Sequence, residues 1–397
     1  MFNQLQSVPP DALLKLIVQH SQDTNPNKVD LGVGVYKNES GQTPIMQAVV
    51  KAEHIILEQQ QTKSYIGPAG SQLYCDLSAQ LIFGKDHSVI KDKRISVAQT
   101  PGGCGALRMA SEFINTCKKN AVIWVSTPTW VNHVPLMCDA GLELKEYPYY
   151  DYQTKSVDFS AMLESLNQAN EGDLVLLHGC CHNPSGADLS HQQWQQLTDF
   201  ILEKNLIPFV DIAYQGLGDG LEEDAYGLRL LAQNVPEMIV ASSCSKNFGL
   251  YRERTGTVII ISSNAERALI SGSQLYSTIR GNYSMPPAHG AAIVETILND
   301  QSLYTHWSDE LTSMRTRLAS NRLNLVSAIN GMNTGQNFDF ITKEKGMFSF
   351  LNITAQQVDR LRDEYSIYMA GSSRINIAGI AAHNVEYVAN AVANVIK

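Results

Sequence analysis

The sequence lacks several features that mark whole classes of protein. It has no apolar run near the ~18 residues that a membrane-spanning helix needs, so we expect no membrane segment. Its 30 Lys and Arg are outnumbered by 39 Asp and Glu, and a net charge of -9 argues against a nucleic-acid-binding protein. The first residues, MFNQLQSVPP, show no basic start followed by an apolar stretch. We therefore expect a cytoplasmic protein.

The cysteines also lack the spacing of a metal or redox motif. Seven occur in 397 residues, and no two form a CxxC pair. This disfavours zinc-ribbon and thioredoxin chemistry and favours reduced thiols. His178 and His182 flank Cys180 and Cys181, but their spacing matches no recognised ligand set, so we expect no metal site.

Three common nucleotide-binding or catalytic signatures are missing. Gly32 and Gly34 begin a GxG pattern, but Lys37 stands where the dinucleotide-binding fingerprint needs a third glycine. Neither the GxxxxGK[ST] phosphate loop nor the GxSxG nucleophile elbow occurs. The sequence therefore gives no support for phosphoryl transfer by a P-loop or for an α/β-hydrolase.

What the sequence does contain is an alternation of apolar runs with helix-like stretches. The runs are continuous, as is typical of strands covered on both faces. Helical patterns such as the one at 191–206 lie between them, which indicates an α/β fold with a mostly parallel, doubly wound sheet. The apolar runs lie at 121–125, 174–178, 207–210, 238–242 and 257–261.

The C-terminal part has a different pattern, which indicates a second, smaller α/β domain. A long helical pattern covers 300–330, short strands are expected at 346–350 and 374–377, and helices at 354–365 and 383–396. The N-terminal segment precedes the first regular α/β unit, and we expect it to join the small domain. The predicted limits are 1–45 for this segment, 46–300 for the large domain and 301–397 for the small domain.

Reactive side chains follow several of the predicted strands. Ligands of open α/β sheets bind outside the carboxyl ends of the strands, so we expect these side chains to converge at one edge. They bring together an aromatic ring, an amide, a carboxylate, a phenol and an amine. The residues are Trp130, Asn183, Asp211, Tyr214 and Lys246.

Lys246 and Asp211 suggest a particular coenzyme. In a partly dry pocket the pKa of Lys246 would fall and its amine become nucleophilic; the alternative is an ordinary surface lysine. Asp211 would need a cationic or protonated partner; the alternatives are a helix N-cap or a metal ligand. Tyr214 could reach the same ligand or serve only in packing. Lysine and aspartate on neighbouring strand ends suit pyridoxal phosphate, which takes a Schiff-base lysine and a carboxylate at its pyridinium nitrogen.

A phosphate group needs a cup of donors, and the sequence offers one. The turn TPGGCG at 100–105, which includes Gly103 and Cys104, precedes a helical stretch, so free N–H groups and a helix dipole would face an anion. Arg254 could bind phosphate in a bidentate manner, and Ser243 and Ser245 could donate hydroxyls. The alternative is a plain loop.

Linked motifs along the whole chain show a resemblance to a known family. They are LGVGVYKNESG (31–41), HGCCHNPSG (178–186), DIAYQG (211–216), SSCSKNFGLYRERTG (242–256), NYSMPPAHG (282–290), GMFSF (346–350) and SRINIAG (373–379). In this order and spacing they resemble the class I aminotransferases of fold type I, and most of all the bacterial aspartate and aromatic amino-acid branch. The resemblance implies pyridoxal phosphate as coenzyme.

The resemblance also implies roles around the coenzyme ring. Lys246 matches the lysine that holds the coenzyme covalently, and Asp211 matches the carboxylate at the pyridine nitrogen. Tyr214 and Asn183 match the pair that bonds the ring oxygen. Trp130 matches the aromatic side chain that stacks on the ring and, with Asn183, borders the substrate.

The phosphate cup implied by the resemblance consists of Gly103, Cys104, Ser243 and Arg254, with Tyr65 reaching it from a second subunit. Relatives usually have Thr or Ser at the position of Cys104. Because a thiol is a weaker donor than a hydroxyl, we expect slightly weaker retention of the coenzyme.

Substrate binding is implied for two arginines and a glycine. Arg374 matches the residue that binds the substrate α-carboxylate, with Gly34 nearby. Arg280 matches an arginine that crosses a dimer interface and pairs with a side-chain carboxylate. A homodimer is therefore implied, in which Tyr65 and Arg280 serve the partner's site.

The implied activity is ping-pong transamination between an amino acid and 2-oxoglutarate. Two arginines favour aspartate and glutamate as substrates, because a guanidinium binds a carboxylate in a bidentate manner. The alternative is an enzyme that acts mainly on aromatic amino acids. Two other classes stay open: a decarboxylase or lyase with the same coenzyme, and a binding protein that has lost activity.

Overall fold

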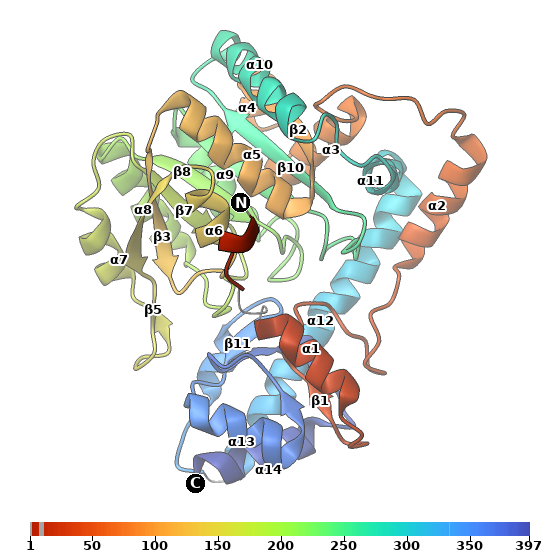
Figure 1. Ribbon diagram of the computed structural model, residues 1–397, viewed down its shortest axis with the longest axis vertical. Helices are drawn as coiled ribbons and strands as arrows, with labels where there is room; N and C mark the ends of the chain where they lie inside the picture. The colour runs from red at the N-terminus through yellow and green to blue at the C-terminus, as the bar shows by residue number, and fades with distance from the viewer. Residues whose placement is uncertain (1, 8–11, 333) are drawn as a thin grey trace.

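A seven-stranded sheet lies at the centre of the larger part of the molecule (Figure 1). The computed structural model describes residues 2–7, 12–332 and 334–397. The strand order is β2-β10-β9-β8-β7-β3-β4, and only β10 runs antiparallel to its neighbours. The expected α/β fold with a mostly parallel sheet is confirmed. The strands are β2 (Ile95–Pro101), β3 (Val122–Thr127), β4 (Glu143–Pro148), β7 (Leu174–His178), β8 (Ile207–Ile212), β9 (Met238–Ser243) and β10 (Thr255–Ile261).

Helices cover both faces of this sheet, which explains its continuous apolar strands. In β7, Leu174 and Leu176 face one helical layer, whereas Val175 and Leu177 face the other. The first layer contains α5 (Gly102–Cys117), α6 (His133–Cys138) and α10 (Ala265–Asn282). The second contains α3 (Gln72–Phe83), α4 (Ser88–Lys91), α7 (Phe159–Leu166), α8 (His191–Glu203) and α9 (Tyr226–Asn234).

The long helix α12 (Gln301–Gly331) joins the sheet to a smaller group of elements (Figure 1). In that group, the strands β11 and β13 form an antiparallel pair, and α13 packs on α14, which packs on α12. Near the start of α12, α2 and α11 pack against each other and against it. The bounds are β11 (Phe348–Phe350), β13 (Arg374–Asn376), α13 (Ala355–Tyr365), α14 (Val385–Ile396), α2 (Gln47–Gln59), α11 (His289–Asn299), η2 (Asp339–Lys343) and η3 (Ile377–Gly379).

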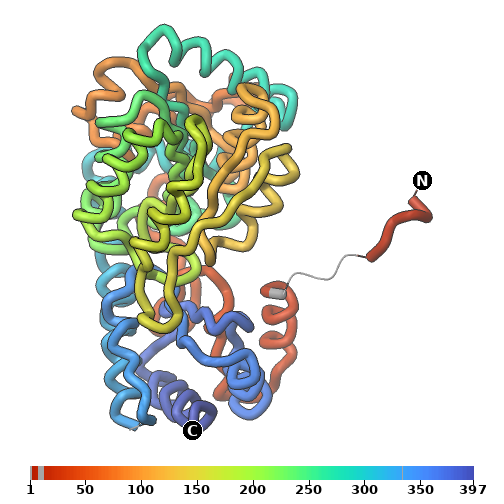
Figure 2. The backbone as a smooth tube through the Cα atoms, turned by 90° about the vertical axis from the view of Figure 1, so that its left-hand side faces the viewer, coloured from red at the N-terminus to blue at the C-terminus, as the bar shows by residue number. Residues whose placement is uncertain are grey.

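The N-terminal segment lies beside this smaller group. Its strand β1 (Val29–Asp30) pairs in parallel with β12 (Ile367–Tyr368), and α1 (Ala12–Gln22) precedes it. Figure 2 shows residues 2–7, with η1 (Phe2–Gln4), standing away from the rest of the chain. The domain limits at 45 and 300 stay a prediction, and residues 1, 8–11 and 333 lie outside the described residues. A small hairpin of β5 (Tyr150–Asp151) and β6 (Ser156–Val157) completes the strands of the described ranges.

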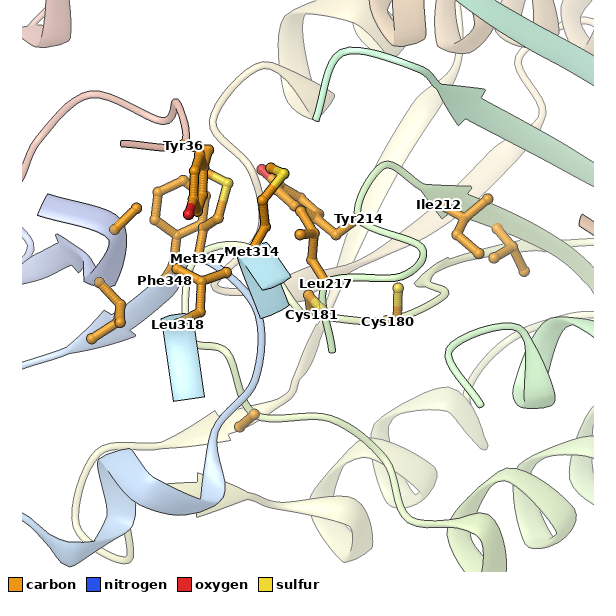
Figure 3. Packing of buried hydrophobic residues seen from close by; sticks show 14 of the residues in the cluster. Tyr36, Cys180, Cys181, Ile212, Tyr214, Leu217, Met314, Leu318, Met347 and Phe348 are labelled. Atoms are coloured by element: carbon orange, nitrogen blue, oxygen red, sulfur yellow. The ribbon is translucent and has the colours of Figure 1, made fainter. Parts of the chain in front are cut away.

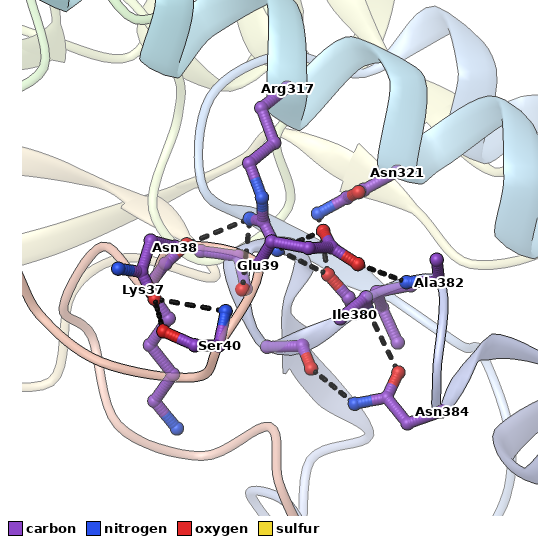
Figure 4. A network of polar contacts seen from close by, with 12 residues as sticks. Lys37, Asn38, Glu39, Ser40, Arg317, Asn321, Ile380, Ala382 and Asn384 are labelled. Atoms are coloured by element: carbon purple, nitrogen blue, oxygen red, sulfur yellow. Dashed lines mark hydrogen bonds and ion pairs between the residues drawn. The ribbon is translucent and has the colours of Figure 1, made fainter.

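One guanidinium group connects α12 to the N-terminal segment and to the residues that follow β13 (Figure 4). Arg317 donates from Nη1 to the carbonyl oxygens of Lys37 at 2.7 Å and Ala378 at 3.3 Å. From Nη2 it donates to the carbonyl oxygen of Ile380 at 2.9 Å and pairs with Glu39 at 3.3 Å. The N-terminal segment is thereby fixed against the residues that follow β13.

Buried apolar side chains fill the seam between the two groups of elements (Figure 3). Met347 and Phe348 come from the smaller group, Cys181 and Leu217 from loops after β7 and β8, and Met314 from α12. The two groups therefore share one continuous core.

Two expectations from composition can be compared with the structure. Among the helices of the described ranges, none is long and apolar enough to cross a membrane. The seven cysteines, all within these ranges, are free thiols.

The seam leaves no room for a side chain at Gly186. A Cβ there, at φ +74°, would lie 2.3 Å from the carbonyl oxygen of Phe348, whereas Gly172, at φ +77°, has nothing within 4 Å. Both Gly→Ala changes force a left-handed backbone, but only Gly186→Ala also pushes β11 away. We expect Gly186→Ala to lower the free energy of unfolding by about 1–3 kcal/mol more than Gly172→Ala, measured by urea denaturation. Equal losses would contradict the tight seam.

Candidate active site

A cavity of about 270 Å³ lies at the carboxyl ends of the parallel strands. Residues that end or follow β3, β7, β8 and β9 line it from the sheet, and Phe348 and Arg374 line it from the smaller group. The reactive side chains that were predicted to converge at one edge of the sheet therefore lie together in this cavity. The predicted site residues that line the cavity are Gly34, Gly103, Cys104, Trp130, Asn183, Asp211, Tyr214, Ser243, Ser245, Lys246, Arg254 and Arg374.

Lys246 projects into the cavity from the loop after β9. Its Nζ lies 4.9 Å from the centre of the Tyr214 ring. Burial lowers the pKa of Lys246, although the nearby Asp211 opposes the shift. At neutral pH, a larger fraction of this amine is therefore neutral and nucleophilic than in an exposed lysine. This environment favours the reactive interpretation of Lys246 over that of a surface lysine.

Asp211 lies in β8 and keeps its charge although it is buried. The Nε2 atom of His133 lies 3.0 Å from its Oδ2. Burial alone would raise the pKa of Asp211, but the hydrogen bond from His133 and the attraction of the nearby Lys246 outweigh burial, so the pKa is lowered. Asp211 therefore presents a negative charge to any ligand in the cavity.

A line of hydrogen bonds orients the His133 ring. Its Nδ1 lies 2.8 Å from Oγ1 of Thr129, and that oxygen lies 3.1 Å from Nε2 of His178. The Nδ1 atom of His178 accepts the Asn183 backbone N–H at 3.4 Å, and burial lowers the pKa of His178 to about 3. Because a carboxylate only accepts, His133 donates from Nε2, and Nδ1 accepts from the Thr129 hydroxyl.

The structure gives roles to histidines whose function the sequence left open. His133 was not among the predicted residues, and its only signal in the sequence is its place just after Trp130. His178 and His182, which the sequence analysis considered as metal ligands, form hydrogen bonds with the hydroxyl groups of Thr129, Ser126 and Ser185.

Another group of side chains has ligand atoms close together. In the described chain, the ligand atoms of Cys180, Cys181 and Asp224 lie near enough to share an ion. The Asp224 carboxylate accepts the N–H groups of Gly216 and Gly218. A hydrogen bond to Cys181 and burial raise the pKa of Cys180, so this thiol is protonated when no ion is bound.

The start of α5 lies at a corner of the cavity whose groups suit an anion. Its N-cap residue, Pro101, makes no side-chain cap, so the first N–H groups of the helix stay free for a ligand. The guanidinium of Arg254 packs so closely that a Cβ on Gly102 would lie 2.5 Å from its Nη2. Arg254 is oriented by donating from Nη1 to the Tyr251 carbonyl oxygen at 3.0 Å.

The other predicted members of the cup lie in the same corner. Gly103 lies against Ser243, because a Cβ added to it would lie 3.1 Å from the Ser243 Cβ. The Ser245 backbone N–H donates to the Ser243 hydroxyl at 3.2 Å. The Sγ of Cys104 lies 3.8 Å from the Nδ2 atom of Asn132.

Arg374 forms the opposite wall of the cavity. It donates from Nη1 to Asn183 Oδ1 at 3.3 Å and from Nη2 to the Gly32 carbonyl oxygen at 3.1 Å. Its guanidinium carbon lies 4.3 Å from the centre of the Phe348 ring. Its buried Nε has no hydrogen-bond partner among the described residues. Gly34 leaves this part of the cavity open, because a Cβ at this position would lie only 3.1 Å from the Phe348 ring.

Tyr65 and Arg280 do not line the cavity of their own chain. Tyr65 is 92% exposed, and Arg280, at the end of α10, donates only to the Ser284 hydroxyl at 2.8 Å among the contacts described. Their segments lie together, because the Ile66 N–H donates to the Met285 sulfur at 3.4 Å.

Comparison with known proteins assigns the family. The family model described as aminotransferase class I and II matches residues 26–392. The chain is 46% identical over 396 residues to the aspartate aminotransferase of Haemophilus influenzae, covering 100% of both chains. It is 44% identical over 394 residues to the aromatic-amino-acid aminotransferase of Pseudomonas aeruginosa, covering 99% of this chain and 98% of that one.

A solved structure supports the same assignment. The aromatic-amino-acid aminotransferase from Burkholderia pseudomallei, covalently bound to pyridoxal phosphate, matches with a TM-score of 0.98 and 41% identity, covering 100% of both chains. Fold and site thus define an α/β enzyme of the pyridoxal-phosphate-dependent transferases. The chain belongs to the class I and II aminotransferase family, which confirms the predicted fold type, enzyme class and coenzyme.

The cavity fits this coenzyme on its own chemistry. The uncapped start of α5 and Arg254 suit a phosphate, and the negative charge of Asp211 suits a protonated ring nitrogen. Trp130 offers an aromatic surface, and Lys246 offers the amine for the covalent link.

Cys104 gives a test of the anion-binding corner. Because a hydroxyl donates a stronger hydrogen bond to phosphate than a thiol does, Cys104→Ser should retain the coenzyme more tightly, by about 2- to 10-fold in its dissociation constant. The measurement is the release of coenzyme absorbance during dialysis. The control, Cys117→Ser, changes an exposed thiol outside the cavity and should match the wild type. Weaker retention by Cys104→Ser would contradict the assigned position.

Proposed function

We propose that the enzyme transfers the amino group of aspartate to 2-oxoglutarate. The supporting observation is one cavity in which the Lys246 amine and the ionised Asp211 face Arg374, a buried guanidinium held in place by Asn183 and the Gly32 carbonyl oxygen. An enzyme that acts mainly on aromatic amino acids is the alternative, because relatives of both names are similar to this chain.

The residues around the coenzyme have separate tasks in this proposal. Bound pyridoxal phosphate supplies an aldehyde that joins to amines and a ring that accepts electrons. Lys246 would hold the coenzyme through Nζ, and its neutral amine would act as the base that takes the substrate α-proton and as the acid that returns it. Asp211 holds a proton at the ring nitrogen. Tyr214 and Asn183 orient the ring through its oxygen, and Trp130 stacks on it.

The remaining cavity residues bind the two ends of the ligands. Arg374 binds the substrate α-carboxylate from the wall of the cavity, and Gly34 leaves space beside it. The phosphate is held at the start of α5. Its ligands are Gly103, Cys104, Ser243, Ser245 and Arg254.

We further propose a homodimer in which each chain completes the partner's site. Tyr65 would reach the partner's phosphate and Arg280 the side-chain carboxylate of the partner's substrate. The support is that Tyr65 is 92% exposed and lies near other exposed apolar residues, such as Ile66 at 40% and Leu73 at 45%. Large exposed apolar surfaces are typical of interfaces. A cytoplasmic location, which free thiols favour, is also part of the proposal.

Lys246→Ala tests the chemistry. Without the amine that forms the link and moves the proton, turnover should fall at least about 100-fold. The assay couples aspartate, tyrosine or phenylalanine to 2-oxoglutarate and detects the glutamate formed, which also separates a transaminase from a decarboxylase or lyase. Lys119→Ala, a change at an exposed lysine, is the control. Wild-type rates in Lys246→Ala, or borohydride reduction that fixes the coenzyme to another residue, would refute the assignment.

Arg280→Ala tests the dimer and the substrate together. Loss of a charge-assisted pair should lower kcat/KM for aspartate by about 10- to 100-fold and spare phenylalanine, which has no side-chain carboxylate. Arg267→Ala, an exposed arginine of the same helix, is the matched control. Equal loss for both substrates would contradict the role of Arg280, and a monomer in sedimentation analysis of the wild type would contradict the shared site.

A further inference from the structure

A buried arginine outside the cavity holds the strand that shapes its substrate side. Arg322 of α12 is 3% exposed. It donates from Nη2 to the carbonyl oxygens of Gly346 at 2.9 Å and Phe348 at 2.7 Å. From Nη1 it donates to the Ile341 carbonyl oxygen at 3.2 Å and to the Ser349 hydroxyl. One side chain therefore fixes β11 and the turn before it.

The position of β11 decides where Arg374 lies. Phe350 pairs with Arg374 in the β11–β13 register, and the Phe348 ring lies 4.3 Å from the Arg374 guanidinium carbon. The loop that contains Asn183 is attached to the same turn, because the Lys345 N–H donates to the Gly186 carbonyl oxygen at 2.7 Å. A shift of this turn would therefore move both the guanidinium and its neighbour Asn183.

Glu344 is the unusual member of this turn. It is 4% exposed, and its Oε2 lies 3.8 Å from Arg322 Nη1 without a hydrogen-bond partner among the described residues. Its Oε1 accepts a long hydrogen bond, 3.4 Å, from the Tyr150 hydroxyl, and the Ser349 hydroxyl also stabilises the ionised carboxyl group. The Arg322 donors are already given to β11 and its turn, so an ionised Glu344 is poorly satisfied as the structure stands.

Few other titratable groups face Glu344. They are Arg322 from α12, the uncharged phenol of Tyr150 from β5 and Asp188 from the loop after β7. The neighbouring Lys345 turns to Asp219 instead.

We propose that Arg322 and Glu344 are a proton-linked pair of positioning residues for Arg374. With Glu344 neutral, Arg322 gives its donors to β11 and the turn. With Glu344 ionised, the carboxylate competes for Nη1, loosens this turn and weakens carboxylate binding at Arg374. The inference rests on the proposed role of Arg374 as the ligand of the substrate carboxylate.

The ionisation of the neighbouring groups fits this pair. Burial raises the pKa of Glu344 to about 8, against the opposing attraction of Arg322. Burial lowers the pKa of Arg322 to about 10, and burial raises that of Asp188 to about 6. Around neutral pH, Glu344 is therefore mostly protonated while Arg322 is charged and Asp188 is ionised. Between pH 7 and 9 the main change in this group is the loss of the Glu344 proton.

The test compares holoenzymes of the wild type and Glu344→Gln, a neutral side chain of nearly the same shape. Succinate, a dicarboxylate with no amino or oxo group, is the probe, and its dissociation constant is measured by calorimetry from pH 6 to 9.5. The two proteins should agree at pH 6. At pH 9 the wild type should bind about fivefold or more weakly than Glu344→Gln. The same ratio should appear in KM for aspartate and not in kcat.

A stability measurement gives a second readout. A carboxyl group whose folded pKa is raised loses stabilising free energy as pH rises from its unfolded value of 4.5 to about 8. The thermal midpoint of the wild type should therefore fall more over this window than that of Glu344→Gln. Glu386→Gln, at an exposed residue of α14, should follow the wild type in both measurements.

Two outcomes would overturn the inference. One is an identical pH dependence of succinate affinity in the wild type and Glu344→Gln. The other is an equal loss of affinity in Glu344→Gln at every pH, which a purely structural role predicts. Failure of the proposed function shows separately: if Arg374→Ala binds succinate as well as the wild type, the carboxylate site is misassigned whatever Glu344 does.

Discussion

The negative charge of Asp211, held at the buried end of a parallel sheet, is the constraint on which the rest of the site depends. Removing a carboxylate from water costs several kcal/mol, so it needs a donor fixed in place. His133 is that donor, and Thr129 and His178 fix its ring through hydrogen bonds that end at the Asn183 backbone. The ends of β3, β7 and β8 are thereby tied to one another. The hydrogen bonds that satisfy the charge of Asp211 thus also hold the floor of the cavity in place.

The two sides of the cavity come from different parts of the chain. The sheet ends supply the amine, the carboxylate and the anion-binding corner, whereas β11 and β13 supply Phe348 and Arg374. In the proposed function, the coenzyme chemistry and the choice of substrate therefore rest on different elements. A change in β11 or its turn can alter substrate affinity while Lys246 and Asp211 stay in place. The continuous core across the seam holds the two sides of the cavity in position relative to each other.

The parts of the site that sequence could predict are those set by local pattern. Continuous apolar runs identified five of the seven strands of the sheet but missed β2 and β4. The rule that ligands bind at strand ends placed Asp211 and Lys246 together. His133 escaped prediction because its partner Asp211 lies 78 residues away, and no local pattern links them. Arg322 was hidden for the same reason: the helical pattern predicts a long helix but not which cation it buries. Tyr65 and Arg280 were suggested only by family resemblance, because a single chain leaves both outside the cavity.

The hydrogen bonds of Arg374 explain why it suits a carboxylate in the proposed function. Two of its nitrogen atoms donate to Asn183 and Gly32, and its guanidinium carbon lies 4.3 Å from the centre of the Phe348 ring, so the group is held in one orientation at the wall of the cavity. A guanidinium is planar and always charged, and its donors match the two oxygens of a carboxylate. Because the group is already held in place, less side-chain entropy is lost when a carboxylate binds. In the proposed function, the selection for carboxylates therefore follows from the orientation that Asn183, Gly32 and Phe348 give to this guanidinium.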